Sequence, residues 1–134
     1  MNELKIFAKE EFGRLRTVLI EGRPWFVGND VTRILGYSNG SKAIADLVDM
    51  EDKLNNESLS SLGLNDEWVI NESGLYSLIL SSKLESAKRF EYWISSEVIP
   101  AIRKASRHIL QQKPLSNEEL IANIELSKLP IKFL

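Results

Sequence analysis

The stretch from Asn71 to Lys104 constrains the fold of this chain more than any other part of its sequence. Asn71 can cap a first helix, in which apolar residues recur at three- and four-residue spacing. Ser82 and Glu85 match the Ser-x-x-Glu pattern that begins many helices, so we expect a second, longest helix over about residues 84–108. Its apolar stripe consists of Ala87, Phe90, Trp93, Ile94, Val98, Ala101 and Ile102. A helix with one apolar face must pack against a partner surface, which the rest of the chain has to supply.

Pro100 lies inside the apolar pattern of this second helix. Proline has no amide hydrogen to donate, and its ring crowds the carbonyl oxygen four residues earlier, which here belongs to Ser96. We therefore expect either a kink at Pro100 or a break after which the helix starts again.

Two long motifs, in this order along the chain, resemble a known family. The first is PWFVGNDVTRILGY at residues 24–37, and the second is NESGLYSLI at 71–79 followed by AKRFEYWISSEVIPAIRK at 87–104. They resemble the Bro-N domain, named for the repeated open reading frames of baculoviruses and common at the front of phage antirepressor proteins. The resemblance covers roughly residues 3–106. The segment 55–66 departs from it, because it lacks the basic, glycine-rich character often found there.

The size and composition of the chain suit one compact domain with a short appendage, since it has 134 residues of which 43% are hydrophobic. The absence of cysteine excludes disulfides and thiolate zinc sites. No apolar run is long enough to span a membrane, and the N-terminus carries acidic residues where a signal peptide needs an apolar core. We expect a soluble protein in the cytoplasm, which is the bacterial host cytoplasm if the chain is phage-encoded, and no membrane partner.

Charge is distributed unevenly along the chain although the net charge is only −2. Residues 47–72 carry one basic and seven acidic side chains, whereas residues 73–113 carry seven basic and three acidic side chains. A basic segment beside an acidic one can direct a polyanion to one face of the molecule. The alternative is that both segments are ordinary solvated surfaces, and a pI near 5.5 favours that alternative because it lacks the usual basic character of a nucleic-acid binder.

The first seventy residues predict a small antiparallel sheet in an α+β fold. Residues 4–7, 14–20 and 25–27 have strand-like patterns, and the turn chemistry of residues 21–24 joins the last two into a hairpin or meander. Residues 67–70 predict a further strand. Arg14 and Arg16 fall on one face of their strand, where they are either solvated or in contact with phosphate.

Two short helices are predicted between these strands, over residues 29–35 and 41–48, with Gly36 ending the first. Helix, glycine turn and helix within about twenty residues is the outline of a helix-turn-helix. The second helix would present Ser41, Lys42 and Asp46, with Asn39 at its entrance. Helix pairs of this kind are also common in proteins that do not bind DNA, so this outline leaves both interpretations open.

The remaining segments define the expected domain organisation. Residues 49–66 are acidic and polar, and we expect a loop with little regular structure there. Residues 1–108 are expected to form the Bro-N-like domain, and 109–134 a linker and a terminal helix. That helix is too short to bury its apolar face alone. It is expected to pair with a second copy or to lead to an absent C-terminal domain, because proteins that resemble this one usually carry a variable second domain.

No catalytic constellation is recognisable in the sequence, and we expect neither an enzyme nor a metal or cofactor site. The single histidine, His108, lies in a basic tail, and no glycine-rich phosphate loop or nucleophile elbow is present. Glu72 is interpreted as a helix-start charge, and Glu97 as a buried ion-pair partner of Arg103. The larger aromatic residues have helical or strand spacing that predicts core positions instead of a base-stacking platform; they are Trp25, Phe26, Tyr76, Phe90, Tyr92 and Trp93.

The resemblance implies regulatory DNA binding by a phage-type antirepressor. The candidate phosphate contacts are Arg14, Arg16, Lys42, Lys83, Lys88 and Arg89, and the candidate base contacts are Asn39 and Ser41. One alternative is a protein-interaction module that binds a phage repressor, which suits the nearly neutral net charge. Another is an assembly domain that forms a homo-oligomer through its C-terminal helix. The DNA interpretation requires these cations to share one face, with the acidic segment placed elsewhere.

Overall fold

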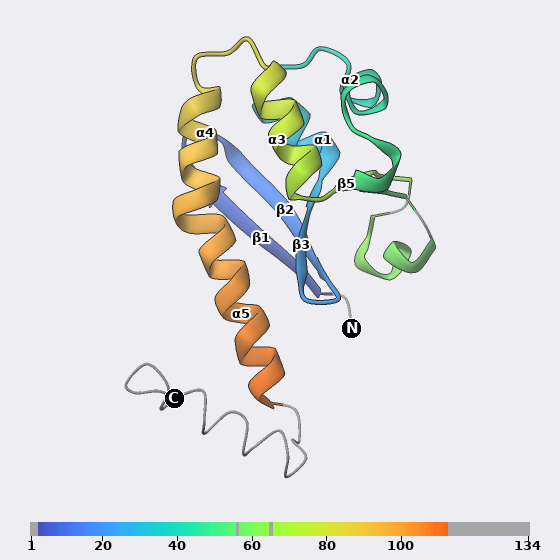
Figure 1. Cartoon of the computed structure of the whole chain (residues 1–134), viewed down its shortest axis with the longest axis vertical. Coiled ribbons are helices and arrows are strands. Elements are labelled where there is room, and N and C mark those ends of the chain that lie inside the picture. The colour runs from blue at the N-terminus through green and yellow to red at the C-terminus, as the bar shows by residue number, and fades with distance from the viewer. Residues whose placement is uncertain (1–2, 56, 65, 113–134) are drawn as a thin grey trace, which may run out of the picture.

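A computed structural model describes residues 3–55, 57–64 and 66–112 of the chain, and its strands form one five-stranded antiparallel sheet. The predicted N-terminal meander and the strand before Asn71 are both confirmed (Figure 1). In the spatial order β1-β2-β3-β5-β4, the strands are β1 (Glu3–Lys9), β2 (Gly13–Ile20), β3 (Arg23–Val27), β5 (Val69–Ile70) and β4 (Lys53–Leu54).

The sheet is covered by four helices, so the predicted α+β class is confirmed. Three of them are α1 (Gly28–Ile34), α2 (Gly40–Leu47) and α3 (Glu72–Ser81). The fourth is a continuous helical segment composed of α4 (Ala87–Trp93), η3 (Ile94–Val98) and α5 (Ile99–Gln112). In Figure 1 this segment runs down one side of the molecule, and α5 extends beyond the sheet.

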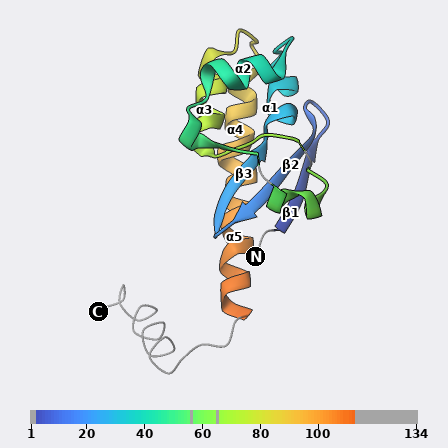
Figure 2. The same cartoon turned by 90° about the vertical axis from the view of Figure 1, so that its right-hand side faces the viewer.

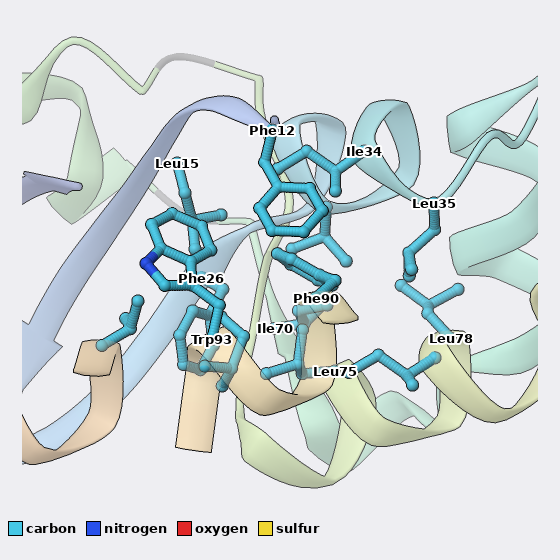
Figure 3. Packing of buried hydrophobic residues seen from close by; sticks show 14 of the residues in the cluster. Phe12, Leu15, Phe26, Ile34, Leu35, Ile70, Leu75, Leu78, Phe90 and Trp93 are labelled. Carbon is cyan, nitrogen blue, oxygen red and sulfur yellow. The ribbon is translucent and has the colours of Figure 1, made fainter. Parts of the chain in front are cut away.

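The main core lies between the sheet and the helices (Figure 3). The register pairs Phe7 with Leu15 and Phe26 with Ile70, so these side chains share the face that α3 and α4 cover. Phe90 of α4 is fully buried against this face. Its ring contacts Phe12 edge-on at 5.4 Å between centroids, and Phe12 in turn stacks on Trp93 at 5.4 Å. The apolar stripe read from the sequence is therefore the part of the chain that closes the core.

The predicted start of this long helix needs correction. It begins at Ala87 instead of residue 84, and the Ser82 hydroxyl donates to the carbonyl oxygen of Leu35 at 2.9 Å while it accepts from the amide of Leu84 at 3.2 Å. Of the two outcomes expected at Pro100, the break and restart does not occur. The backbone widens into a π-helical turn over η3, where the amide of Ile99 donates to the carbonyl oxygen of Ile94, and this wider turn accommodates the proline that follows.

The prediction of an irregular loop over residues 49–66 is wrong in part. This segment contains η1 (Met50–Asp52), β4 and η2 (Glu57–Leu62), and it covers the second face of the sheet. Leu59 and Leu64 are buried there against Val18, Val27 and Val69. These elements are too short to have a readable periodicity, and they are stabilised by tertiary packing on the sheet. The predicted terminal helix beyond residue 112 lies outside the described residues.

Gly36 ends the α1 region in the left-handed conformation, as predicted, with φ of +79°. A β-carbon at this position would lie 2.7 Å from Cδ1 of Leu84, so the α3–α4 connection packs directly on this turn. We expect Gly36→Ala to lower the free energy of unfolding by about 1–2 kcal/mol, because alanine strains the backbone and displaces Leu84. Chemical denaturation measures this effect.

Gly63→Ala is the matched control for Gly36→Ala, since Gly63 has a φ of +78° but no heavy atom within 4 Å of an added β-carbon. It isolates the backbone contribution, and we expect it to cost about 1 kcal/mol. If both variants lower the free energy of unfolding equally, the packing of Leu84 on Gly36 does not contribute to stability.

Candidate nucleic-acid interface

Three chain connections meet at the end of the molecule opposite the C-terminus of α5, and we call this surface the loop end (Figure 1). It consists of the β1–β2 turn at residues 10–12, the α1–α2 turn at 35–39 and the α3–α4 connection at 82–86. Hydrogen bonds and packing join the three. Ser82 bonds to Leu35 and Leu84 packs on Gly36, while Arg33 donates to the carbonyl oxygens of Phe12 at 3.2 Å and Arg14 at 2.6 Å.

Four cationic side chains lie in the segments that adjoin the β1–β2 turn. Arg14 is the second residue of β2, Lys88 and Arg89 lie in the first turn of α4, and all three are exposed. Arg89 reaches across to the turn, where its Nε donates to Oε2 of Glu11 at 2.6 Å. The fourth is Arg33, which sequence reasoning missed because nothing in its helix pattern indicates that its guanidinium reaches the hairpin. The fold thus places Lys88 and Arg89 of α4 and Arg33 of α1 beside the β1–β2 turn, and Arg89 is partly neutralised by Glu11, while the side chain of Arg14 lies on the sheet face opposite α4.

The remaining candidate cations continue across the loop end. Lys83 is exposed on the α3–α4 connection. Lys42 lies on α2, which contacts α3 on the side away from α4, and its ammonium group forms an ion pair with Asp46 at 2.7 Å. The hydrogen bond to Asp46 raises the pKa of Lys42 above its ordinary value. Lys42 is therefore separated from Lys88 and Arg89, because α3 lies between α2 and α4 (Figure 1).

Asn39 and Ser41, the candidate base contacts, are both exposed at the start of α2. Oδ1 of Asn39 accepts a hydrogen bond from the backbone amide of Lys42 at 3.1 Å and so caps the helix. Gly40 permits a close approach of α1 and α2, because a β-carbon there would lie 2.5 Å from the hydroxyl oxygen of Thr32. The side-chain amide nitrogen of Asn39 and the hydroxyl of Ser41 are thus held on an outward-facing helix start.

Arg16 has a different environment from the other candidates. Its Nε and Nη2 donate to the two carboxylate oxygens of Asp30 at 2.9 Å, and its Nη1 and Nη2 donate to those of Glu67 at 3.0 and 2.9 Å. These hydrogen bonds, with Asp30 contributing most, raise the pKa of the guanidinium further above its usual range. The structure gives Arg16 a bonding role inside the fold in place of the expected phosphate contact, since both edges of its guanidinium are occupied.

Tyr92 is not in the core, contrary to the prediction from aromatic spacing, because its exposed fraction is 70%. It lies four residues after Lys88 and three after Arg89 on α4, and the three side chains line a shallow hollow of about 280 Å³ with Phe12 at its base. The signal was available in the sequence. Tyr92 falls outside the apolar stripe formed by Phe90 and Trp93, on the same helix face as the two cations.

The prediction of an ion pair between Glu97 and Arg103 is wrong. Arg103 lies 3.7 Å from Glu72, whereas Glu97 is exposed and lies 3.5 Å from Lys9. Glu97 and Arg103 are six residues apart, a spacing that places them on different faces of the helix, and the π-helical turn begins three residues before Glu97. Within the described ranges, no group of three or more metal-ligating side chains has the arrangement needed to hold a metal ion.

The acidic middle of the chain lies away from the cations at the hairpin. In Figure 1 the segment containing η1 and η2 is on the opposite side of the molecule from α4, and Figure 2 shows it in front with α4 behind. Carboxylates are nevertheless present at the loop end, where Glu11 pairs with Arg89 and Asp46 with Lys42. No helix in the described part of the chain combines the length and apolar character required to cross a bilayer.

Comparison with known families gives a match to the model of the BRO family N-terminal domain over residues 14–100. An uncharacterized protein of Haemophilus influenzae is 36% identical over 99 residues, which cover 74% of this chain and 49% of that protein. Putative Bro-N domain-containing protein 289L of Invertebrate iridescent virus 6 is 31% identical over 128 residues, covering 82% of this chain and 31% of that protein.

A Bro-N domain-containing protein of Acanthamoeba polyphaga mimivirus, L2, is 32% identical over 102 residues, which cover 68% of this chain and 42% of that protein. The chain thus spans about half, or less, of the length of these relatives. No solved structure matches this chain.

Proposed function

Because this chain belongs to the Bro-N family, we propose that it is a DNA-binding regulatory domain of the phage-antirepressor type. The observation that carries the proposal is the pair of exposed cations Lys88 and Arg89 on α4, which line one hollow with residues of the β1–β2 turn and bond to that turn through Glu11. A duplex presents one phosphate charge per ~1.7 Å of its axis, so closely placed exposed cations are the chemistry that it requires. The proposed activity is binding, without a catalytic step.

Phosphate contacts and base contacts would have different origins in this arrangement. Arg14, Lys83, Lys88 and Arg89 would contact phosphates and set the orientation of the duplex, with Lys42 as an outlying contact. The exposed start of α2, where Asn39 and Ser41 lie, would read base edges. Arg16 is left out of the proposed interface because Asp30 and Glu67 occupy its guanidinium.

Charge reversal at α4 is expected to weaken binding to all DNA sequences alike. Lys88→Glu combined with Arg89→Glu removes two phosphate contacts, and each contact contributes about 0.9 to the slope of log K against log salt concentration on duplex DNA. We therefore expect the slope to become shallower by about 1.8. Fluorescence-anisotropy titration of a random duplex at several salt concentrations measures both the affinity and the slope.

Arg23→Glu combined with Lys104→Glu is the matched control, because it changes the net charge equally at exposed positions far from the loop end. The control should retain most of the affinity and the salt slope. Equal losses in the two double variants would mean that only overall charge matters, and the proposed site would then be wrong. If the unmodified chain binds no duplex at low salt, direct DNA binding itself is excluded.

A second candidate function is docking on a phage repressor protein. The observation that favours it is exposed apolar surface at and beside the loop end, where Leu84 is 45% exposed and Leu80, in the last turn of α3, is 82% exposed. Large apolar side chains beside mixed charges are more typical of a protein-binding surface than of a phosphate-binding one. Leu80→Ser should leave DNA affinity unchanged but weaken antirepression in a reporter strain if this alternative holds.

Two further parts of the proposal concern the whole protein. The described domain continues through α5 to Gln112, and we propose that residues 109–134 connect it to a C-terminal domain and contribute to oligomerisation. Deletion of residues 114–134, followed by measurement of the mass in solution, tests the contribution of this segment.

A further inference from the structure

β1 is a long edge strand whose outer side is paired with no other strand among the described residues. All seven of its residues, Glu3 to Lys9, pair with β2, so the strand is straight enough to present a continuous row of backbone groups outward. The other edge of the sheet, β4, has only two residues. An edge of this length is a template for another strand.

The sequence of β1 is self-complementary in one antiparallel register. When a two-fold axis perpendicular to the sheet passes through Ile6, Glu3 of one copy faces Lys9 of the other at both ends of the strand pair. Leu4 then faces Ala8, and Ile6 faces Ile6 of the second copy. Lys5 faces Phe7, so no like charges are opposed, and opposite charges directly across a strand pair are stabilising.

The neighbouring registers lack this complementarity. An axis through Lys5 opposes Lys5 to itself, and an axis through Phe7 opposes Lys5 to Lys9. Each of these registers also leaves residues at one end unpaired. Lysine residues on an edge strand normally discourage pairing. In β1 their positions allow one register and penalise the others.

The side chains around the axis are suited to burial in such a pair. The register with β2 places Leu4, Ile6 and Ala8 on one face, and Ile6 is 43% exposed although it is apolar. Among the described residues, Lys9 has only a long, solvent-exposed contact with Glu97 at 3.5 Å, so it remains able to face a carboxylate of a second copy. We propose that β1 pairs with β1 of a second copy about Ile6, which joins two sheets into one continuous sheet in a homodimer. This inference does not rest on DNA binding.

Cross-linking through a single introduced cysteine tests the register, since the chain has no cysteine of its own. In an antiparallel pair, directly opposed α-carbons lie about 4.5–5.5 Å apart, which suits a disulfide. Ile6→Cys in the full chain should therefore form a disulfide-linked dimer on mild oxidation. Met50→Cys is the control, because Met50 is 77% exposed and off the edge, and it should give at least about tenfold less dimer. Equal cross-linking in both variants would overturn the proposal.

Charge variants test the pairing without a covalent bond. Ile6→Glu opposes two carboxylates at the axis and should shift the chain to the monomer in sedimentation equilibrium. Glu3→Lys should raise the dimer dissociation constant, and adding Lys9→Glu to it should restore pairing because the charges are exchanged. A chain that is monomeric at all concentrations, or a dimer that survives Ile6→Glu and is lost only on deletion of residues 114–134, would show that β1 is not the interface. Circular dichroism of each variant confirms that the fold is retained.

Discussion

Arg16→Ala is expected to lower the free energy of unfolding by about 3–5 kcal/mol, because it leaves Asp30 buried without its cation. Asp30 is only 8% exposed, and Arg16 supplies three hydrogen bonds to its carboxylate, two from the guanidinium and one from the backbone amide. The same guanidinium holds Glu67 just before β5. One substitution therefore removes the side-chain hydrogen bonds that join β2 to α1 and to the chain segment before β5. Thermal denaturation should show a melting temperature more than about 10 °C lower.

Arg14→Ala is the control for this loss, since Arg14 lies on the same strand and the same face but is exposed. It should change stability by no more than about 0.5 kcal/mol. The double variant Arg16→Met with Asp30→Leu removes this ion pair, and it should recover part of the stability because the buried Asp30 carboxylate is no longer left unpaired, whereas the more exposed Glu67 still loses its cation. Equal effects of Arg14→Ala and Arg16→Ala would contradict a structural role for Arg16.

Phe90→Ala is expected to cost about 3–5 kcal/mol, because it removes a fully buried ring and leaves a cavity between the sheet and α4. The cavity would be lined by Phe12 and Trp93, whose rings are packed on each other and on Phe90 (Figure 3). Phe90→Leu refills much of the space and should cost less than half as much. Urea denaturation with intrinsic tryptophan fluorescence follows both variants.

Tyr92→Ala is the matched control on the same helix. Tyr92 is 70% exposed, so its removal should change the free energy of unfolding by at most about 0.5 kcal/mol. If Phe90→Ala proves as mild as Tyr92→Ala, α4 does not close the core in solution.

Much of the fold follows from local patterns in the sequence. The strands before Gly28 were predicted because alternating apolar residues and turn residues are properties of short segments, and the same holds for α1, α2 and α3. Asn71 caps α3 through a hydrogen bond from the amide of Gly74 at 2.9 Å, as its side chain predicted. The left-handed Gly36 is another local feature that a single residue determines.

The incorrect predictions concern side chains and short segments whose partners lie far away in the sequence. Ser82 had the correct spacing to begin a helix, yet its hydroxyl bonds to Leu35, which lies 47 residues away in the sequence. The sequence suggested that Arg16 is a surface cation, but the fold places Asp30 and Glu67 beside it. β4 and η2 form because the sheet offers a second apolar face, and no periodic pattern in residues 49–66 reveals that face.

The sequence by itself determined the family, the α+β class, the main strands and helices, and the apolar stripe that closes the core. These properties depend on residues within a few positions of one another, so their spacing carries the information. Only the tertiary structure decided which charged side chains are neutralised inside the fold, which lie together around the β1–β2 turn, and which strand edge is left unpaired. Such properties depend on contacts between segments far apart in the chain, and local spacing does not encode them.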